Sequence, residues 1–342
     1  MKKIMLIGAF GNGTPTTSGQ IIRTNITYNE LIKRYGKKNV LAVNTSESRI
    51  KCLAKLVWHL FRVKDIMVIL SSNGMRVMYP ILEKTAKLFG KKVLNSVVGG
   101  TIKPILRAYP KCREAMKSFN VNWVQLPDMV KELEADGIYN GEVLPNAKPL
   151  KLVTAEEMKP VSNPPYKFCT FSRISKEKGI EDAIEAVKKM NENGVIATLD
   201  IYGAPDENYI KDFEKIMSEV PKYITYCGVA EYDKTSDLLK DYYMLLFPTT
   251  FDGEGFPGTL IDAMFAGLPV IATDWRHNGA VITDGQTGYL YDYKDKEKLP
   301  MLMEKAILNP ETVYGMREKC LKEAEKYTIE RAMDIICKRI DG

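Results

Sequence analysis

Several features that would direct a protein to a membrane or out of the cell are missing from this chain of 342 residues. No apolar run approaches the roughly 18 residues that a membrane-spanning helix needs. The short apolar stretch that follows Lys3 leads into Gly, Asn and Pro rather than into a small-residue cleavage site. We therefore expect a soluble, cytoplasmic protein whose first apolar run is a strand.

Metal-binding and disulfide patterns are equally scarce. The six cysteines form no C-x-x-C pair and the only histidines are His59 and His277, which argues against a zinc site or a disulfide framework. No Asp-x-Asp sequence occurs. If the chain handles a nucleotide diphosphate, basic side chains and backbone N–H groups have to hold it. We expect no metal and no other cofactor.

Charge is distributed unevenly along the chain. Residues 1–150 contain 24 Lys and Arg against 10 Asp and Glu, a net charge of +14, whereas residues 151–342 contain 25 against 33, a net charge of −8. Such a split suggests that one half faces an anionic partner. A solvated basic surface and contact with anionic lipid or a phosphate-bearing acceptor both fit, and we expect no nucleic-acid partner.

The chain is too long for one ordinary core and suits two domains. In both halves strand-length apolar runs alternate with segments of helical spacing, which predicts an α/β fold with parallel, doubly wound sheets. The predicted strands cover residues 4–7, 40–43, 66–70, 93–98 and 123–126, then 167–171, 197–202, 223–227, 244–247, 269–272 and 289–291. Prolines between residues 145 and 165 interrupt this pattern and mark the interdomain connection.

These elements predict two Rossmann-like domains that face a cleft. The first domain covers residues 1–160 and the second covers residues 161–325. A C-terminal helix over residues 326–342 can cross back to pack on the first domain. In open parallel sheets, ligands bind at the carboxyl ends of the strands, so both domains are expected to present their sites there.

The segment from Glu254 to Asp262 is the strongest candidate site. It is a Gly- and Pro-rich loop after a buried strand, and it runs into a helix that starts near Gly258-Thr259. Glycines allow close backbone approach to a ligand, and a helix N-terminus suits a phosphate. Glu254 could reach a sugar hydroxyl, and Asp262 could accept two ribose hydroxyls. Taken alone, this segment favours an ordinary strand–loop–helix connection with an acidic residue in its first turns.

A second loop, from Phe171 to Ile180, also connects a strand to a helix and contains Arg173 and Lys178. Two cations at the carboxyl edge of a sheet could neutralise a diphosphate leaving group without a metal. A solvated basic loop is the simpler explanation of this pattern taken alone.

The functional interpretation of the two loops is strengthened by three further motifs in residues 167–292. In order, the chain reads Phe-Ser-Arg-Ile-Ser-Lys-Glu-Lys-Gly, Leu-Asp-Ile-Tyr-Gly, Tyr-Cys-Gly-Val, Glu-Gly-Phe-Pro-Gly-Thr-Leu-Ile-Asp-Ala and Thr-Gly-Tyr-Leu-Tyr. This half resembles the donor-binding half of the group 1 (family 4) retaining glycosyltransferases of the polysaccharide-biosynthesis type, which have the two-domain GT-B fold.

The resemblance implies a role for each matching residue. Arg173 and Lys178 would bind the donor diphosphate and Glu254 would contact the transferred sugar, so these three are the catalytic candidates. Asp262 stands where the family has the second Glu of its Glu-x7-Glu motif. The remaining donor-side candidates are backbone groups of the glycine-rich loop and residues beside the base, namely Gly255, Phe256, Gly258, Thr259, Cys227, Gly228 and Val229.

The first half matches the family more weakly. Gly11 and Gly13 are expected to approach the donor, and Gly19, Gly99 and Gly100 are expected on the acceptor side. Gly11-Asn-Gly13 does not complete the G-x-G-x-x-G fingerprint, which disfavours a nicotinamide site. Many relatives carry a His in this half near Gly99, and this chain has none there.

The sequence thus predicts transfer of a sugar from a nucleotide diphosphate sugar to a hydroxyl of a glycan or lipid-linked saccharide, with retained anomeric configuration. UDP-sugar is preferred to GDP-sugar as the donor. The expected location is the cytoplasm, at the inner face of the plasma membrane. A sugar-nucleotide epimerase of the same fold and a non-catalytic nucleotide-sugar-binding partner subunit stay open as alternatives.

Residues 48–64 alternate apolar and basic side chains. As a helix, this segment could lie on an anionic membrane surface. A packing helix that covers the N-terminal sheet is the favoured interpretation, because this is the commoner role of an amphipathic helix.

Overall fold

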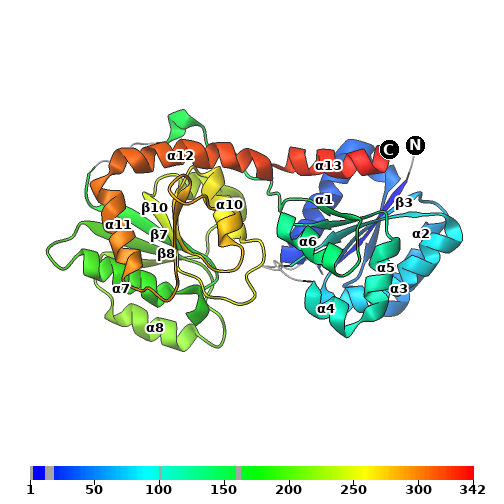
Figure 1. Cartoon of the computed structure of the whole chain (residues 1–342), viewed down its shortest axis with the longest axis horizontal. Coiled ribbons are helices and arrows are strands. Elements are labelled where there is room, and N and C mark those ends of the chain that lie inside the picture. The colour runs from blue at the N-terminus through cyan, green and yellow to red at the C-terminus, as the bar shows by residue number, and fades with distance from the viewer. Residues whose placement is uncertain (1–2, 12–18, 100–101, 159–162) are drawn as a thin grey trace. The chain divides into compact units, whose positions relative to one another are not determined.

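The computed structural model describes residues 3–11, 19–99, 102–158 and 163–342. Contacts between residues divide the chain into two units (Figure 1). Unit 1 comprises Met1–Asn146 with Ile329–Gly342, and unit 2 comprises Ala147–Thr328. Each unit is built on one parallel six-stranded sheet, as the alternation of strands and helices predicts.

The sheet of unit 1 has the strand order β2-β1-β3-β4-β5-β6. The central strands β1 and β3 contain uninterrupted apolar runs, such as Ile-Met-Leu-Ile in β1, and are buried on both faces, as expected of a parallel sheet between helices. The strands are β1 (Ile4–Gly8), β2 (Val40–Asn44), β3 (Asp65–Leu70), β4 (Lys92–Val97), β5 (Val121–Val124) and β6 (Gly141–Val143). The helices are α1 (Gly19–Tyr35), α2 (Arg49–Leu60), α3 (Ser72–Phe89), α4 (Lys103–Ala108), α5 (Pro110–Ser118) and α6 (Pro127–Ala135).

The strand predicted at residues 123–126 begins two residues earlier, at Val121, and ends at Val124. Its start was hidden because a polar residue, Asn122, lies inside it. The Asn122 amide is buried and satisfied, since it donates to the Met116 carbonyl (2.8 Å) and accepts from the Asn95 amide (2.9 Å). The edge strand β6 was not predicted, because it is short and only partly buried.

The sheet of unit 2 has the strand order β12-β11-β10-β7-β8-β9. Its strands are β7 (Tyr166–Phe171), β8 (Ala197–Tyr202), β9 (Ile224–Gly228), β10 (Met244–Phe247), β11 (Val270–Thr273) and β12 (Gly288–Tyr291). The helices are α7 (Ile180–Met190), α8 (Ile210–Glu219), α9 (Thr235–Leu239), α10 (Gly258–Phe265), α11 (Lys298–Leu308) and α12 (Pro310–Ala324). Side chains from α7, α8, α11 and α12 share one apolar core with the strands.

Each segment that joins the two units packs within one of them. Leu150, Val153 and Met158 are buried, and the Val153 N–H donates to the Phe265 carbonyl (3.0 Å), so this stretch belongs to unit 2 although the sequence-based boundary falls at residue 160. The final helix, α13 (Ile329–Asp341), packs in unit 1. No helix among the described residues is long and apolar enough to cross a membrane.

Candidate functional site

The two predicted donor loops lie at the same edge of the unit 2 sheet. β7 and β10 are adjacent parallel strands, so the loops that follow them emerge side by side. They are tied together, because the Thr250 N–H donates to the Glu177 carbonyl (2.7 Å). Gly179 has a φ of +72°, and a Cβ there would lie only 2.2 Å from the Pro248 carbonyl oxygen. The two loops thus form one platform whose close contact requires a glycine.

Lys178 and Glu254 meet on this platform. Their side chains are only 9% and 11% exposed and form an ion pair. The Thr249 hydroxyl, itself fully buried, donates to the Glu254 Oε2 (3.3 Å). The structure therefore brings together the predicted diphosphate-binding cation and the predicted sugar-contacting acid, one from each loop.

Arg173 lies on the same platform and is more open to solvent. Its side chain is half exposed, and its guanidinium is 3.5 Å from the Asp206 carboxylate. The Arg173 Cζ lies 5.4 Å from the centroid of the Phe251 ring, and the Lys178 Nζ lies 5.0 Å from the same centroid. Cations within about 6 Å of a ring centroid are attracted to it, so Phe251 helps to hold both cations at the sheet edge.

The start of α10 has no side-chain cap. Pro257 occupies the N-cap position and provides no side-chain hydrogen bond, and the first turn contains no acidic residue. The first backbone N–H groups of a helix need acceptors from outside the helix, which an anion can supply. The predicted donor-loop residues Gly258 and Thr259 form this first turn, Gly255 precedes it, and the buried Phe256 packs on Tyr327.

Asp262 lies one turn into α10 and is buried. Its Oδ1 accepts a hydrogen bond from the Lys148 Nζ at 2.5 Å. Burial raises the pKa of the Asp262 carboxyl, and the Lys148 ammonium opposes this shift. A Cβ on Gly258 would lie 3.4 Å from the Lys148 Nζ, so the ammonium also sits beside the helix start. The predicted ribose-binding acid is therefore accompanied by a cation.

Lys148 and Phe251 were not among the predicted site residues. Lys148 lies in the proline-rich connection, 114 residues before Asp262, and no local pattern sets it apart. Phe251 stands inside the glycine-rich loop, where an aromatic side chain could have been noticed as a partner for the two predicted cations. Both residues acquire their roles only through contacts between distant segments.

The residues predicted to lie beside the base are at the carboxyl end of β9. In the sheet, β8 separates β9 from β7, which the loop with Arg173 and Lys178 follows. Cys227 and Val229 are exposed, and Gly228 ends the strand. Desolvation of its sulfur atom raises the pKa of the Cys227 thiol above its ordinary value, and the nearby Asp200 carboxylate raises it further.

In unit 1 the described candidates lie at the carboxyl edge of the sheet. Gly11 follows β1, Gly19 opens α1, and Gly99 follows β4. Asn44 holds the backbone just after β1, since its Oδ1 accepts from the Phe10 N–H (3.0 Å). Gly13 and Gly100 lie outside the described residues.

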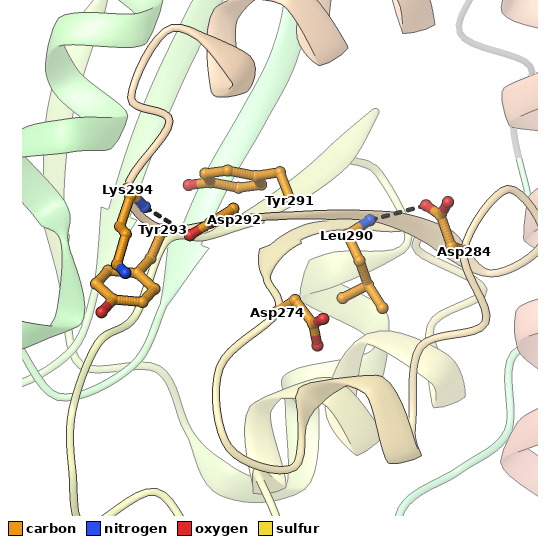
Figure 2. Close-up of a pocket in the computed structure, with 7 residues that line it drawn as sticks. All are labelled: Asp274, Asp284, Leu290, Tyr291, Asp292, Tyr293 and Lys294. Atoms are coloured by element: carbon orange, nitrogen blue, oxygen red, sulfur yellow. Dashed lines mark hydrogen bonds between the residues drawn. The ribbon is translucent and has the colours of Figure 1, made fainter.

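A hollow beside β12 is lined by three carboxylates, but they do not form a metal site (Figure 2). Asp284 accepts from the Leu290 N–H (2.9 Å) and Asp292 accepts from the Lys294 N–H (3.0 Å), so both stabilise local turns. Asp274 is the third carboxylate. Within the described ranges, no group of three or more His, Cys, Asp or Glu side chains could hold a metal ion.

Several curated proteins are similar in sequence to part of this chain. The curated relatives include the GtfA subunit of UDP-N-acetylglucosamine--peptide N-acetylglucosaminyltransferase from Streptococcus pneumoniae, 35% identical over 127 residues, which are 37% of this chain and 24% of that protein. Poly(glycerol-phosphate) alpha-glucosyltransferase from Bacillus subtilis is 27% identical over 165 residues, 48% of this chain and 24% of that protein. The chain thus spans about a quarter of the length of these relatives.

Among solved structures, Anabaena Alr3699/HepE in complex with UDP and glucose aligns over 100% of both chains, with a TM-score of 0.74 and 13% sequence identity. This likeness confirms the predicted GT-B fold. Residues 154–327 match the sequence model of the family described as "Glycosyl transferases group 1". The match covers half of the chain and includes both loops of the platform, and it confirms the resemblance seen in the sequence. This chain belongs to the group 1 glycosyl transferases, a family of glycosyltransferase enzymes.

Proposed function

We propose that this protein transfers a sugar from a UDP-sugar to a hydroxyl of a glycan or lipid-linked saccharide, without a metal and with retention of the anomeric configuration. The observation that carries the proposal is the cationic platform. Lys178 and Glu254 are paired on it, Arg173 lies beside them, and the uncapped start of α10 follows in the same loop.

The platform suits a reaction in which negative charge grows on a departing diphosphate. Cations and helix N-termini that are already in place stabilise such charge without reorganisation, and removal of one donor group of this kind typically lowers turnover by about 10²–10³-fold. Arg173 and Lys178 would neutralise the diphosphate, as a metal does in other transferases. Lys148, beside the first turn of α10, adds a third positive charge within reach of the same ligand.

Retention is proposed to proceed on one face of the sugar. The leaving phosphate oxygen would accept the proton of the acceptor hydroxyl while the bond from the anomeric carbon to that phosphate oxygen breaks and the bond to the acceptor oxygen forms. Glu254, held by Lys178 and Thr249, would accept hydrogen bonds from hydroxyls of the transferred sugar and so fix its position. Asp262 would accept the ribose hydroxyls.

Uridine is supported as the base by the relatives. The S. pneumoniae relative is named for UDP-N-acetylglucosamine, and the HepE structure contains UDP. The acceptor side is proposed for unit 1 because of the +14 net charge of residues 1–150, which suits a phosphate-bearing acceptor at the inner face of a membrane.

A panel of UDP- and GDP-sugars tests the proposal. The preferred donor should raise the unfolding temperature, because a ligand that binds the folded state stabilises it by mass action. The same donor should release UDP with and without EDTA, and NMR of the glycosylated product should show the donor's anomeric configuration. An inverted product would exclude the proposed mechanism, and stabilisation by GDP-sugars alone would exclude the proposed donor.

A partner subunit that binds a nucleotide sugar without turning it over is a second candidate. The name of the S. pneumoniae relative as a subunit favours it. Slow donor hydrolysis in the absence of acceptor would identify an active enzyme, whereas donor-induced stabilisation without any hydrolysis or transfer would identify the inert subunit.

A further inference from the structure

Helix α2 carries two apolar stripes, and only one of them is buried. Cys52, Leu56 and Leu60 recur every four residues and pack toward the unit 1 sheet, where α2 lies against β2. A second set remains in contact with solvent, with exposed fractions from 51% to 83%, and consists of Ile50, Leu53, Val57, Trp58 and Phe61. The packing role considered for this segment accounts for the first stripe and leaves the second without a partner.

The second stripe continues onto the end of α3. The rings of Phe61 and Phe89 stack edge to face, with centroids 5.3 Å apart, and the neighbouring Leu88 is 76% exposed. Ala54 lies in the shallow hollow between the α2 side chains. We call this surface the α2 patch, and it consists of Ile50, Leu53, Ala54, Val57, Trp58, Phe61, Leu88 and Phe89.

Basic residues occur along α2 and just after its C-terminal end. Residues 48–64 contain five Lys and Arg and no Asp or Glu. The Arg62 guanidinium lies 4.3 Å from the centroid of the Trp58 ring, at the margin of the patch. Lys51 and Lys64 are exposed and form no ion pair among the described residues, whereas Lys55 pairs with Glu47 (2.7 Å). A partner that covers this apolar surface and its basic margin has to offer both apolar and anionic groups.

We propose that the α2 patch binds the surface of an anionic lipid bilayer, with α2 in the plane of the interface. Apolar and aromatic side chains on one face of such a helix enter the region between headgroups and acyl chains, while Lys and Arg stay at the headgroups. A second copy of the chain fits poorly, because pairing two identical patches would bring their basic margins together. The proposal goes beyond donor chemistry, since bilayer binding requires neither donor nor acceptor.

Sedimentation of the full chain with lipid vesicles tests the proposal. Vesicles of phosphatidylcholine mixed with phosphatidylglycerol should bind the protein at low salt, and vesicles of phosphatidylcholine alone should bind it weakly. Each cation near an anionic surface contributes about a fivefold increase in affinity, so K51Q/K64Q should weaken binding by roughly 25-fold. Added salt should weaken the wild type more than this variant.

The apolar contribution is tested by Trp58→Ala combined with Phe61→Ala, which should weaken vesicle binding at least about tenfold. The matched control is Met301→Ala with Leu308→Ala, two exposed apolar residues on α11 of unit 2, and it should bind as the wild type does. Trp58 fluorescence should shift to the blue on binding, and Trp58→Phe should lose most of the shift while it still sediments with vesicles. Unchanged stabilisation by UDP would show that each variant is folded.

Three results would overturn the proposal. The first is no binding of the wild type to anionic vesicles at low salt. The second is equal vesicle binding by the wild type and the Trp58→Ala/Phe61→Ala variant. The third is a dimer in sedimentation velocity that the same double substitution dissociates, which would make the α2 patch an interface between copies. All three are measured without a donor, so they leave the proposed transfer reaction untouched.

Discussion

Breaking the Lys178–Glu254 ion pair from either side should destabilise unit 2 strongly. Both side chains are about nine-tenths buried. Removing one partner of such a pair costs about 3–5 kcal/mol, because an uncompensated charge stays in the interior. For a unit of this size, about 3 kcal/mol corresponds to a fall of roughly 6–12 °C in the unfolding temperature. Replacing both partners by apolar residues should restore most of the loss.

The contacts that remain after each substitution predict which of the two destabilises unit 2 more. After Lys178→Met, the Glu254 carboxylate keeps only the hydrogen bond from Thr249. After Glu254→Leu, the Lys178 ammonium keeps the rings of Phe247 (5.4 Å) and Phe251 (5.0 Å). Desolvated cation–π contacts are worth up to about 2 kcal/mol, so Glu254→Leu should be the milder substitution.

The assay is denaturant unfolding of the wild type, both single variants and the double variant Lys178→Met/Glu254→Leu, followed by a domain-resolving signal such as the fluorescence of Trp275. Lys176→Met, at an exposed position of the same turn, is the matched control and should lie within about 0.5 kcal/mol of the wild type. The reasoning is refuted if the single variants cost less than about 1 kcal/mol, or if the double variant costs as much as their sum.

Three further outcomes follow from the platform. Lys148→Met should weaken UDP binding, and the pKa of Asp262 should rise further because its opposing cation is lost. The folded variant then binds the Asp262 proton more tightly than the unfolded chain does. The loss of stability should therefore be small in acid and should grow as the pH rises above the ordinary Asp pKa of about 4. Denaturant unfolding at a series of pH values measures this loss. Gly179→Ala should lower the unfolding temperature far more than Gly285→Ala, because both glycines have a positive φ but only Gly179 lacks room for a Cβ. Phe251→Leu should raise the KM for the donor with little loss of stability, and an unchanged KM in steady-state assays would contradict the cation–π role.

Local patterns were sufficient to predict most of the fold. β8 and β10 have the predicted limits, because β8 alternates buried and partly exposed side chains and β10 is a compact apolar run that ends before Pro248. β5 began earlier than predicted, since the buried amide of Asn122 reads as a loop residue until its hydrogen-bond partners are known. β6 offered too few apolar residues to be distinguished from a loop.

The candidate site was predictable in its residue types but not in its pairings. The two loops were recognised because they flank strands that also carry the family's motifs. Lys178 is buried against Glu254, which lies 76 residues away in the sequence, and Asp262 is buried against Lys148, which lies 114 residues away. No local periodicity encodes such contacts. The exposure of the second apolar stripe of α2 was also not predictable from the sequence, because an amphipathic helix can pack on a sheet, face a membrane, or do both.

Isothermal titration of UDP and of uridine tests the central claim, the cationic diphosphate platform, most directly. Arg173→Gln is the best variant for this purpose, because its side chain is half exposed and its loss leaves the buried pair intact. A hydrogen bond to a charged group contributes about 1.5–3 kcal/mol, so the Kd for UDP should rise at least about tenfold, while uridine binding and the Lys176→Gln control stay unchanged. Equal UDP affinity in the wild type and Arg173→Gln, or an equal loss for uridine, would contradict the account.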